Sequence, residues 1–159
     1  MDKKILVEKI RQQLEADLKV LQEAAIATYE AATNEESKPE NEYDTRGLEA
    51  SYLAGAQAKR VGEIEEQLTM LKFLQIKSFN DETPLNSTAL IQVEHEGKTN
   101  WLFLLPKGGG LTINVDNLHI QVVTPVSPLG EALVGLTVGD VAIVDRGNKT
   151  LQYEIISAQ

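Results

Sequence analysis

Apolar residues recur at steps of three and four positions in two long segments of the N-terminal half. The first stripe consists of Val7, Ile10, Leu14, Leu18 and Leu21, and the second of Ala54, Gln57, Val61, Ile64, Leu68 and Leu71. This spacing places the residues of each stripe on one face of a helix. It predicts one helix over 4–33 and a second over 46–75.

Small residues gather at the adjoining ends of the two predicted helices. Alanines crowd the end of the first, and Ala50, Ala54, Gly55, Ala56 and Ala58 lie early in the second. If the helices run antiparallel, the small halves face each other and the large halves face each other. This pattern predicts an antiparallel coiled-coil hairpin that tapers toward its tip. At 1.5 Å per residue, each arm would span about 45 Å.

The C-terminal half has a different pattern, in which short β-branched runs alternate with turn signals. The expected strands cover 89–93, 101–105, 111–115, 120–124, 141–144 and 151–156. Ser127 can cap a helix, Pro128 suits its first turn, and Gly135 suits its end, which predicts one short helix over 128–134. The predicted class is α+β, with the helix laid on an antiparallel sheet.

The composition changes near residue 76, where the Ala, Glu and Gln of the helices give way to β-branched residues, Gly and Pro. The stretch 79–88 is polar and rich in turn formers. We therefore expect two domains, a hairpin over 1–76 and a sheet domain over 77–159.

Charge and composition restrict the classes of function. The 159 residues carry a formal net charge of −9, which argues against nonspecific binding to DNA or to an anionic membrane. The absence of cysteine excludes disulfides and cysteine metal sites. No signal peptide and no apolar run of membrane-spanning length is recognised, so we expect a cytoplasmic protein.

Sequence motifs typical of catalysis are not found. The run PKGGG has the wrong order and spacing for a phosphate-binding loop, and we interpret it as a turn between strands. His95 and His119 are far apart in sequence, in expected turn regions, and we interpret both as solvated. Ser127 has no evident base partner. We expect no catalytic residues in this chain.

The connection between the two helices is strongly acidic. Glu36, Glu40, Glu42 and Asp44 lie within nine residues, and Lys38 is the one basic residue among them. Carboxylates suit Mg²⁺, which commonly takes one or two of them and leaves positions for another molecule. Simple solvation, or capping of the second helix by Asp44 or Thr45, are the alternatives.

The two-part plan and three stretches of sequence resemble the bacterial Gre transcription elongation factors, a resemblance that covers nearly the whole chain. The run ESKPENEY, residues 36–43, is similar to the tip of the family's coiled coil. The run GAQAKRVGEIEEQL, residues 55–68, is similar to its second helix. The run SPLGEALVGLTVGDVAIV, residues 127–144, looks like its most recognisable C-terminal segment.

The resemblance implies an FKBP-like topology for the sheet domain and RNA polymerase as the partner. The coiled coil would enter the secondary channel, where tip carboxylates and polymerase share a Mg²⁺ that cleaves backtracked RNA. The factor would not be an enzyme itself, and would contact backtracked RNA only indirectly and bind no specific DNA. The expected polymerase-binding residues are Lys59, Arg60, Ser127, Pro128, Gly135 and Asp140.

Differences from the family pattern leave alternatives open. Pro39 lengthens the tip motif and moves Glu36 and Glu40 one residue further apart. Some relatives enter the same channel and compete there without stimulating cleavage, and this chain could be of that kind. A structural coiled-coil adaptor is a second alternative. Prolyl isomerase activity is a third, although Trp101 and Phe103 are better explained as sheet core than as a pocket.

Overall fold

The computed structural model describes residues 1–34 and 45–159. By their internal contacts these residues form two compact units. One unit contains 10–72. The other, here called the C-terminal unit, contains 73–159 together with residues 1–9, the first turns of the N-terminal helix.

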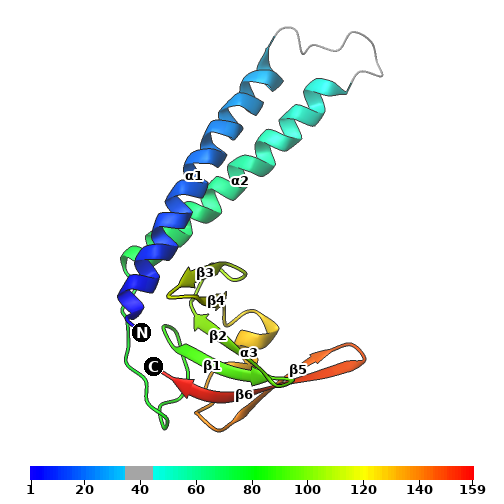
Figure 1. The fold of residues 1–159 in the computed structure, drawn as a ribbon. Coiled ribbons are helices and arrows are strands. Elements are labelled where there is room, and N and C mark those ends of the chain that lie inside the picture. The colour runs from blue at the N-terminus through cyan, green and yellow to red at the C-terminus, as the bar shows by residue number, and fades with distance from the viewer. Residues whose placement is uncertain (35–44) are drawn as a thin grey trace. The chain divides into compact units, whose positions relative to one another are not determined.

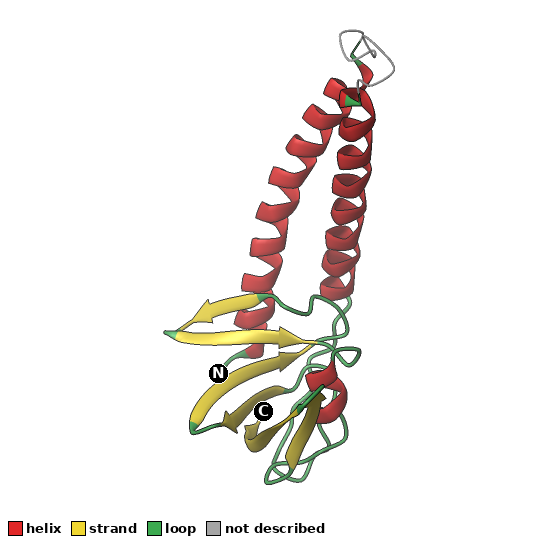
Figure 2. Ribbon diagram, turned by 90° about the vertical axis from the view of Figure 1, so that its right-hand side faces the viewer, coloured by secondary structure: helices red, strands yellow, loops and turns green. Residues whose placement is uncertain are grey.

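Two helices form the hairpin, α1 (Lys3–Thr33) and α2 (Arg46–Lys72). They run antiparallel and side by side (Figures 1 and 2). Ile10, Leu14 and Ile64 are each 1% exposed, so the expected apolar stripes form the seam. Both helices were predicted, although α2 ends three residues earlier than expected.

Six strands and one short helix make up the rest of the C-terminal unit. The strands are β1 (Leu90–His95), β2 (Lys98–Leu104), β3 (Thr112–Val115), β4 (Leu118–Val123), β5 (Val141–Arg146) and β6 (Lys149–Ala158). The helix α3 (Pro128–Leu133) lies between β4 and β5 in the chain. Every predicted strand is present, with ends shifted by a few residues. The fold class is therefore α+β, as predicted.

The strands form one sheet in the order β3-β4-β2-β1-β6-β5. All neighbouring pairs are antiparallel except β2 and β4, which pair in parallel from Trp101 opposite Ile120 to Leu104 opposite Val123. The sheet is thus mixed, and the prediction of a wholly antiparallel sheet was wrong in this detail. The physical reason is that the β3–β4 hairpin folds back so that β4, not β3, lies beside β2.

Tight turns at the strand connections explain the sheet's local geometry. Asp116 and Asn117 both have positive φ, 50° and 64°, and join β3 to β4. Glu96 and Gly97, at 50° and 73°, join β1 to β2 in the same way. Two consecutive residues with positive φ match the right-handed twist of the strands they connect.

The core of the C-terminal unit lies between the sheet and the segments packed on it. Its buried members are Leu85, Ala89, Ile91, Val93, Leu102, Leu104, Val123, Leu133, Ala142 and Ile155. Leu133 comes from α3, which contacts β5. Leu85 comes from the stretch 79–88, expected to be a polar linker, and Ala89 directly follows it. That stretch is tied to the unit, because the Leu85 N–H donates to the Leu136 carbonyl and its own carbonyl accepts from Gly135.

None of the helices in the described part of the chain is both long and apolar enough to cross a membrane.

Candidate functional site

The segment from Thr124 to Asp140 is held by short-range hydrogen bonds around α3. The Ser127 hydroxyl accepts from the Gly130 N–H at 3.1 Å and donates to the Thr124 carbonyl at 2.8 Å. It therefore caps α3, with Pro128 in the first turn, as the sequence predicted. Gly135 follows the helix with φ 86°, a conformation that other residues rarely adopt.

Asp140 closes the next turn. Its carboxylate accepts from the Thr137 N–H at 2.8 Å and from the Thr137 hydroxyl at 2.9 Å. These bonds, the backbone one first, stabilise the ionised form and hold the pKa of Asp140 below its usual 3.8. The backbone of Asp140 also pairs with β6, since its carbonyl accepts from the Ile155 N–H at 2.9 Å.

A pocket of about 540 Å³ opens beside the cap of α3, and we call it the α3 pocket. Ser127, Pro128 and Leu129 form one side, and Tyr153 and Arg146 belong to the strands that line it. This volume is within the roughly 300–1,000 Å³ typical of binding pockets. Two of the six predicted partner-binding residues, Ser127 and Pro128, therefore line a pocket.

The rim of the α3 pocket carries an exposed apolar side chain. Val126 is 89% exposed and lines the pocket directly before the cap. Val126 was not among the residues expected to bind a partner. The sequence did contain a local signal for its exposure. Val126 lies between Pro125 and the helix cap Ser127, outside any periodic apolar pattern that would predict burial.

His95 also lines the α3 pocket. Its ring stacks on Tyr153 with 4.4 Å between centroids, and its Nδ1 bonds the Gln152 carbonyl at 2.7 Å. A carbonyl only accepts, so Nδ1 donates and carries the proton. His95 and His119 lie in β1 and β4 and not in turns, so their expected location was wrong. His119 is hydrogen-bonded to Asn114.

Aromatic residues contribute little to the α3 pocket. Phe103 is 0% exposed and therefore belongs to the core, while Tyr153 lines the pocket. Neither Trp101 nor Phe103 lines it. The lining differs from the aromatic-lined pocket that the isomerase alternative requires.

The predicted basic residues of α2 lie on its exposed surface. Arg60 pairs with Glu63 at 3.0 Å within the helix, and both side chains are about half exposed. Such surface pairs contribute little to stability, on the order of 0–1 kcal/mol. Lys59 is exposed beside it. Both are placed where a partner could reach them.

The acidic connection falls outside the described residues, and with it Glu36, Glu40, Glu42 and Asp44. Their oxygen donors fit Mg²⁺ by chemistry, as hard ligands suit a hard cation. Among the residues that the structure describes, no group of three or more histidines and carboxylates could hold a metal ion.

Comparisons with known proteins agree with the pattern of the C-terminal segment. Residues 113–159 match the family model described as transcription elongation factor GreA/GreB, C-terminal domain. This match contains α3, its cap and part of the α3 pocket, and it confirms the resemblance to Gre factors. Gre factors are accessory transcription factors and not enzymes themselves, as the sequence analysis expected for this chain.

Similar solved structures come from Thermus and Nitrosomonas. GreA factor homolog 1 (Gfh1) of Thermus thermophilus is similar at 18% identity and a TM-score of 0.37, covering 94% of each chain. Gfh1 of Thermus aquaticus is similar at 20% identity and a TM-score of 0.38, covering 96% of this chain and 92% of that one. The transcription elongation factor GreA/GreB from Nitrosomonas europaea is similar at 17% identity and a TM-score of 0.36, covering 60% of this chain and 78% of that one. No curated protein gives a significant match.

Proposed function

We propose that this protein is a Gre-type elongation factor that binds RNA polymerase and modulates elongation through its hairpin. The observation that carries the proposal is the family match over residues 113–159, the part of the chain that holds α3. Beyond docking, such a factor needs an arm that reaches the active site and carboxylates that can bind a metal ion there. The hairpin would be the arm, and the acidic sequence at its connection would provide the carboxylates. The protein would act as a cofactor of another enzyme.

The C-terminal unit is proposed to dock on the polymerase at the α3 pocket. Val126 presents an apolar side chain that is 89% exposed, beside a pocket large enough to receive a partner's side chain. Burying such an exposed residue in an interface gains the free energy of removing apolar surface from water. Gly135 and Asp140 would support docking indirectly, by holding the segment in shape.

This docking is tested by measuring affinity for RNA polymerase core with purified Val126→Asp protein. A charge at this position should weaken binding at least tenfold. Ile143→Asp is the matched control, since Ile143 is 57% exposed on β5 and does not line the pocket. Equal affinity of both variants and the wild type would reject the α3 pocket as the docking site. No binding by the wild type would favour the adaptor alternative.

The tip carboxylates are proposed to share a Mg²⁺ with the polymerase. A second cation in phosphodiester cleavage stabilises charge and activates water. Glu36 and Glu40 would be the first ligands, because they match the family's acidic positions around Lys38, with Glu42 and Asp44 in reserve. Five carboxylates in 35–44 repel one another, so folding alone does not explain their number.

Replacing Glu36 and Glu40 together with Gln should keep polymerase affinity and abolish the effect on backtracked complexes. The measurement is RNA cleavage and elongation in a purified transcription assay with Mg²⁺. If the double variant changes elongation as the wild type does, the carboxylates are not the effector. If the wild type blocks cleavage by an authentic Gre factor, the competitor alternative holds instead.

A further inference from the structure

The charged residues of the six strands are divided between the two faces of the sheet. Side chains alternate between the faces along each strand, and residues directly opposite each other on neighbouring strands share a face. Val93, Leu102 and Tyr153 line the α3 pocket, so the face to which they belong is here called the pocket face. The charge on this face decides what kind of ligand the pocket can attract.

Every lysine and arginine of the strands falls on the pocket face. Lys98 lies opposite His95, which lines the pocket, and Arg146 lines the pocket itself. Lys149 lies opposite Arg146, across the turn that joins β5 to β6. Within the part of the chain that the structure describes, none of the three cationic side chains forms an ion pair. The strands therefore give the pocket face three positive charges.

Every aspartate and glutamate of the strands falls on the opposite face. Glu94 and Glu154 lie opposite each other on β1 and β6, and each adjoins a pocket-lining residue along its own strand. Asp145 lies opposite Thr150, whose hydroxyl donates to its carboxylate at 2.9 Å. Alternation therefore turns all three carboxylates away from the pocket.

Carboxylates outside the strands do not line the α3 pocket either. Glu96, in the turn after β1, lines a different cavity of about 350 Å³ together with Glu94 and Glu154. Glu131 lies in α3, but it is not part of the pocket lining. The described residues that line the pocket thus include one arginine and no carboxylate, in a chain with 24 acidic and 15 basic residues. This local charge favours an anionic ligand.

The arrangement of Arg146 and Lys149 is unfavourable for folding alone. Like charges directly opposite each other on antiparallel strands destabilise a sheet, and these two exposed residues form such a pair. A bound anion would offset the repulsion. The Arg146 guanidinium offers parallel N–H donors that match the two oxygens of a carboxylate or a phosphate, so Arg146 is suited to anchor the anionic group.

The rest of the lining suits an apolar part of the same ligand. His95 and Tyr153 line the pocket as a stacked pair of rings, with 4.4 Å between their centroids. Leu102 and Leu129 add aliphatic walls. Apolar walls with a few placed polar or charged groups are the usual composition of a small-molecule site, and the volume of about 540 Å³ is in the usual range.

We propose that the α3 pocket binds a small organic anion, whose phosphate or carboxylate group pairs with Arg146 and whose apolar part lies against His95 and Tyr153. The net charge of −9 would repel the long phosphate backbone of a nucleic acid, whereas the pocket presents one arginine to one anionic group. The proposal concerns the protein by itself and does not depend on polymerase docking. A bound ligand would compete with docking beside Val126.

The probes are phenyl phosphate and benzoate, each titrated into the purified full-length protein without polymerase. Calorimetry measures the affinity, and amide chemical shifts locate the site, with changes expected over 93–102, 121–129 and 146–153. Binding of either probe at these residues supports the site, and the tighter probe identifies the preferred anionic group. Phenol, which lacks the anionic group, should bind at least tenfold more weakly than the tighter probe.

Arg146→Gln should weaken binding of the tighter probe at least tenfold, because it removes both the charge and the guanidinium fork. Arg60→Gln is the matched control and should stay within twofold, since Arg60 is a half-exposed arginine of α2 that does not line the pocket. Arg146→Lys keeps the charge and should bind more tightly than Arg146→Gln. Urea denaturation should show no loss of stability in Arg146→Gln, because the variant removes a like charge opposite Lys149.

No chemical-shift change at the pocket with either probe, or equal binding by the wild type and Arg146→Gln, would overturn the proposal. Equal binding of phenol would overturn it too, since the anionic group would then contribute nothing. A glutamate-rich peptide or a single-stranded oligonucleotide that binds at the same residues more tightly than both probes would overturn it in favour of a macromolecular partner. Polymerase is absent from these measurements, so their failure is distinct from a failure of docking, which Val126→Asp tests.

Discussion

Single residues around α3 determine whether the segment 124–140, which contains α3 and its cap, keeps its shape. Ser127, Thr137 and Asp140 each bond the backbone or a side chain within three residues. Gly130 has a different constraint, because the chain passes close to it. A Cβ at this position would lie 1.9 Å from the Thr124 carbonyl oxygen.

Gly130→Ala should therefore destabilise the protein by about 3 kcal/mol or more, since the backbone itself must move. Urea denaturation would measure the change. Gly62→Ala serves as the control, because its Cβ meets no atom within 4 Å and alanine favours the helix. An unchanged midpoint for Gly130→Ala would show that the Thr124 contact is easily relieved.

Thr137→Val should raise the pKa of Asp140 part of the way toward its usual value. The variant removes the hydroxyl bond and keeps the stronger contribution from the backbone N–H. Because the folded pKa is depressed, this carboxylate stabilises the fold above its unfolded pKa, and the contribution is lost as pH falls through the folded pKa. A ¹³C NMR titration of the carboxyl group measures the shift, and Thr112→Val should leave it unchanged.

At the scale of elements, the hairpin seam is less apolar than its stripe suggests. The side-chain amide oxygens of Gln57 and Gln67 are buried and, within the described residues, have no hydrogen-bond partner. A buried unpaired acceptor costs on the order of 1–3 kcal/mol. Gln57 and Gln67 therefore each lower the free energy of unfolding of the hairpin.

Gln67→Met should stabilise the protein by about 1 kcal/mol, because it removes an unpaired buried oxygen and keeps a similar volume. Thermal and urea unfolding would both show the gain. Gln13→Met, on the exposed surface of α1, should change stability little. A loss of stability in Gln67→Met would mean that the oxygen is bonded in solution.

At the scale of the whole molecule, the first turns of α1 belong to the C-terminal unit. The Lys3 ammonium donates to the carbonyls of Thr88, at 3.0 Å, and Lys77, and it lies 5.0 Å from the centre of the Phe79 ring. Burial lowers the pKa of Lys3. Thr88 is itself buried with φ 74°, an unusual conformation for a β-branched residue. This junction joins three stretches that are distant in sequence.

Leu6→Ala should destabilise the protein by about 2–5 kcal/mol, because Leu6 is 0% exposed. Hydrogen exchange should show the loss of protection in the C-terminal unit as well as in α1. The adjacent Ile5 is 52% exposed, so Ile5→Ala should have a small effect. Loss of protection confined to residues 10–72 would show that the first turns do not stabilise the C-terminal unit.

The sequence by itself determined the elements of this protein. Spacings of three and four fixed α1 and α2, because one face of each helix must be buried, and alternation with turn residues located all six strands. The cap at Ser127 and the stop at Gly135 were also predictable, since both depend on bonds and torsions within a few residues.

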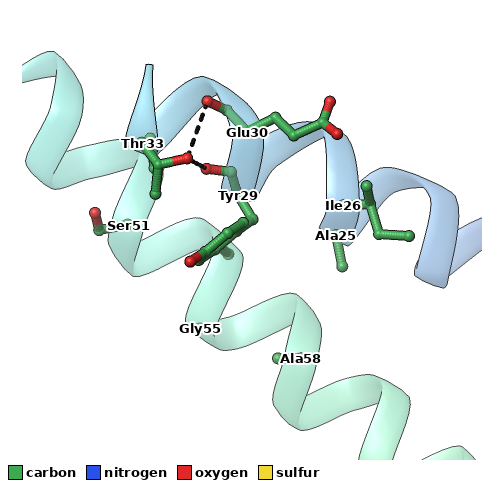
Figure 3. A pocket seen from close by; sticks show the side chains of 10 residues that line it. Ala25, Ile26, Tyr29, Glu30, Thr33, Ser51, Gly55 and Ala58 are labelled. Carbon is green, nitrogen blue, oxygen red and sulfur yellow. Dashed lines mark hydrogen bonds between the residues drawn. The ribbon is translucent and has the colours of Figure 1, made fainter. Parts of the chain in front are cut away.

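Only the tertiary structure decided how distant segments meet. Strand positions do not specify partners, so the parallel pairing of β2 with β4 could not be derived from local pattern. No periodic pattern predicts the surroundings of Lys3, Val126 or Gly130. Lys3 bonds the carbonyls of Lys77 and Thr88, Val126 is left exposed, and Gly130 lies against the Thr124 carbonyl. The cavity of about 600 Å³ that Tyr29 of α1 and Gly55 of α2 help to line (Figure 3) is a further example, because small residues permit either close helix contact or open space, and only packing decides between them.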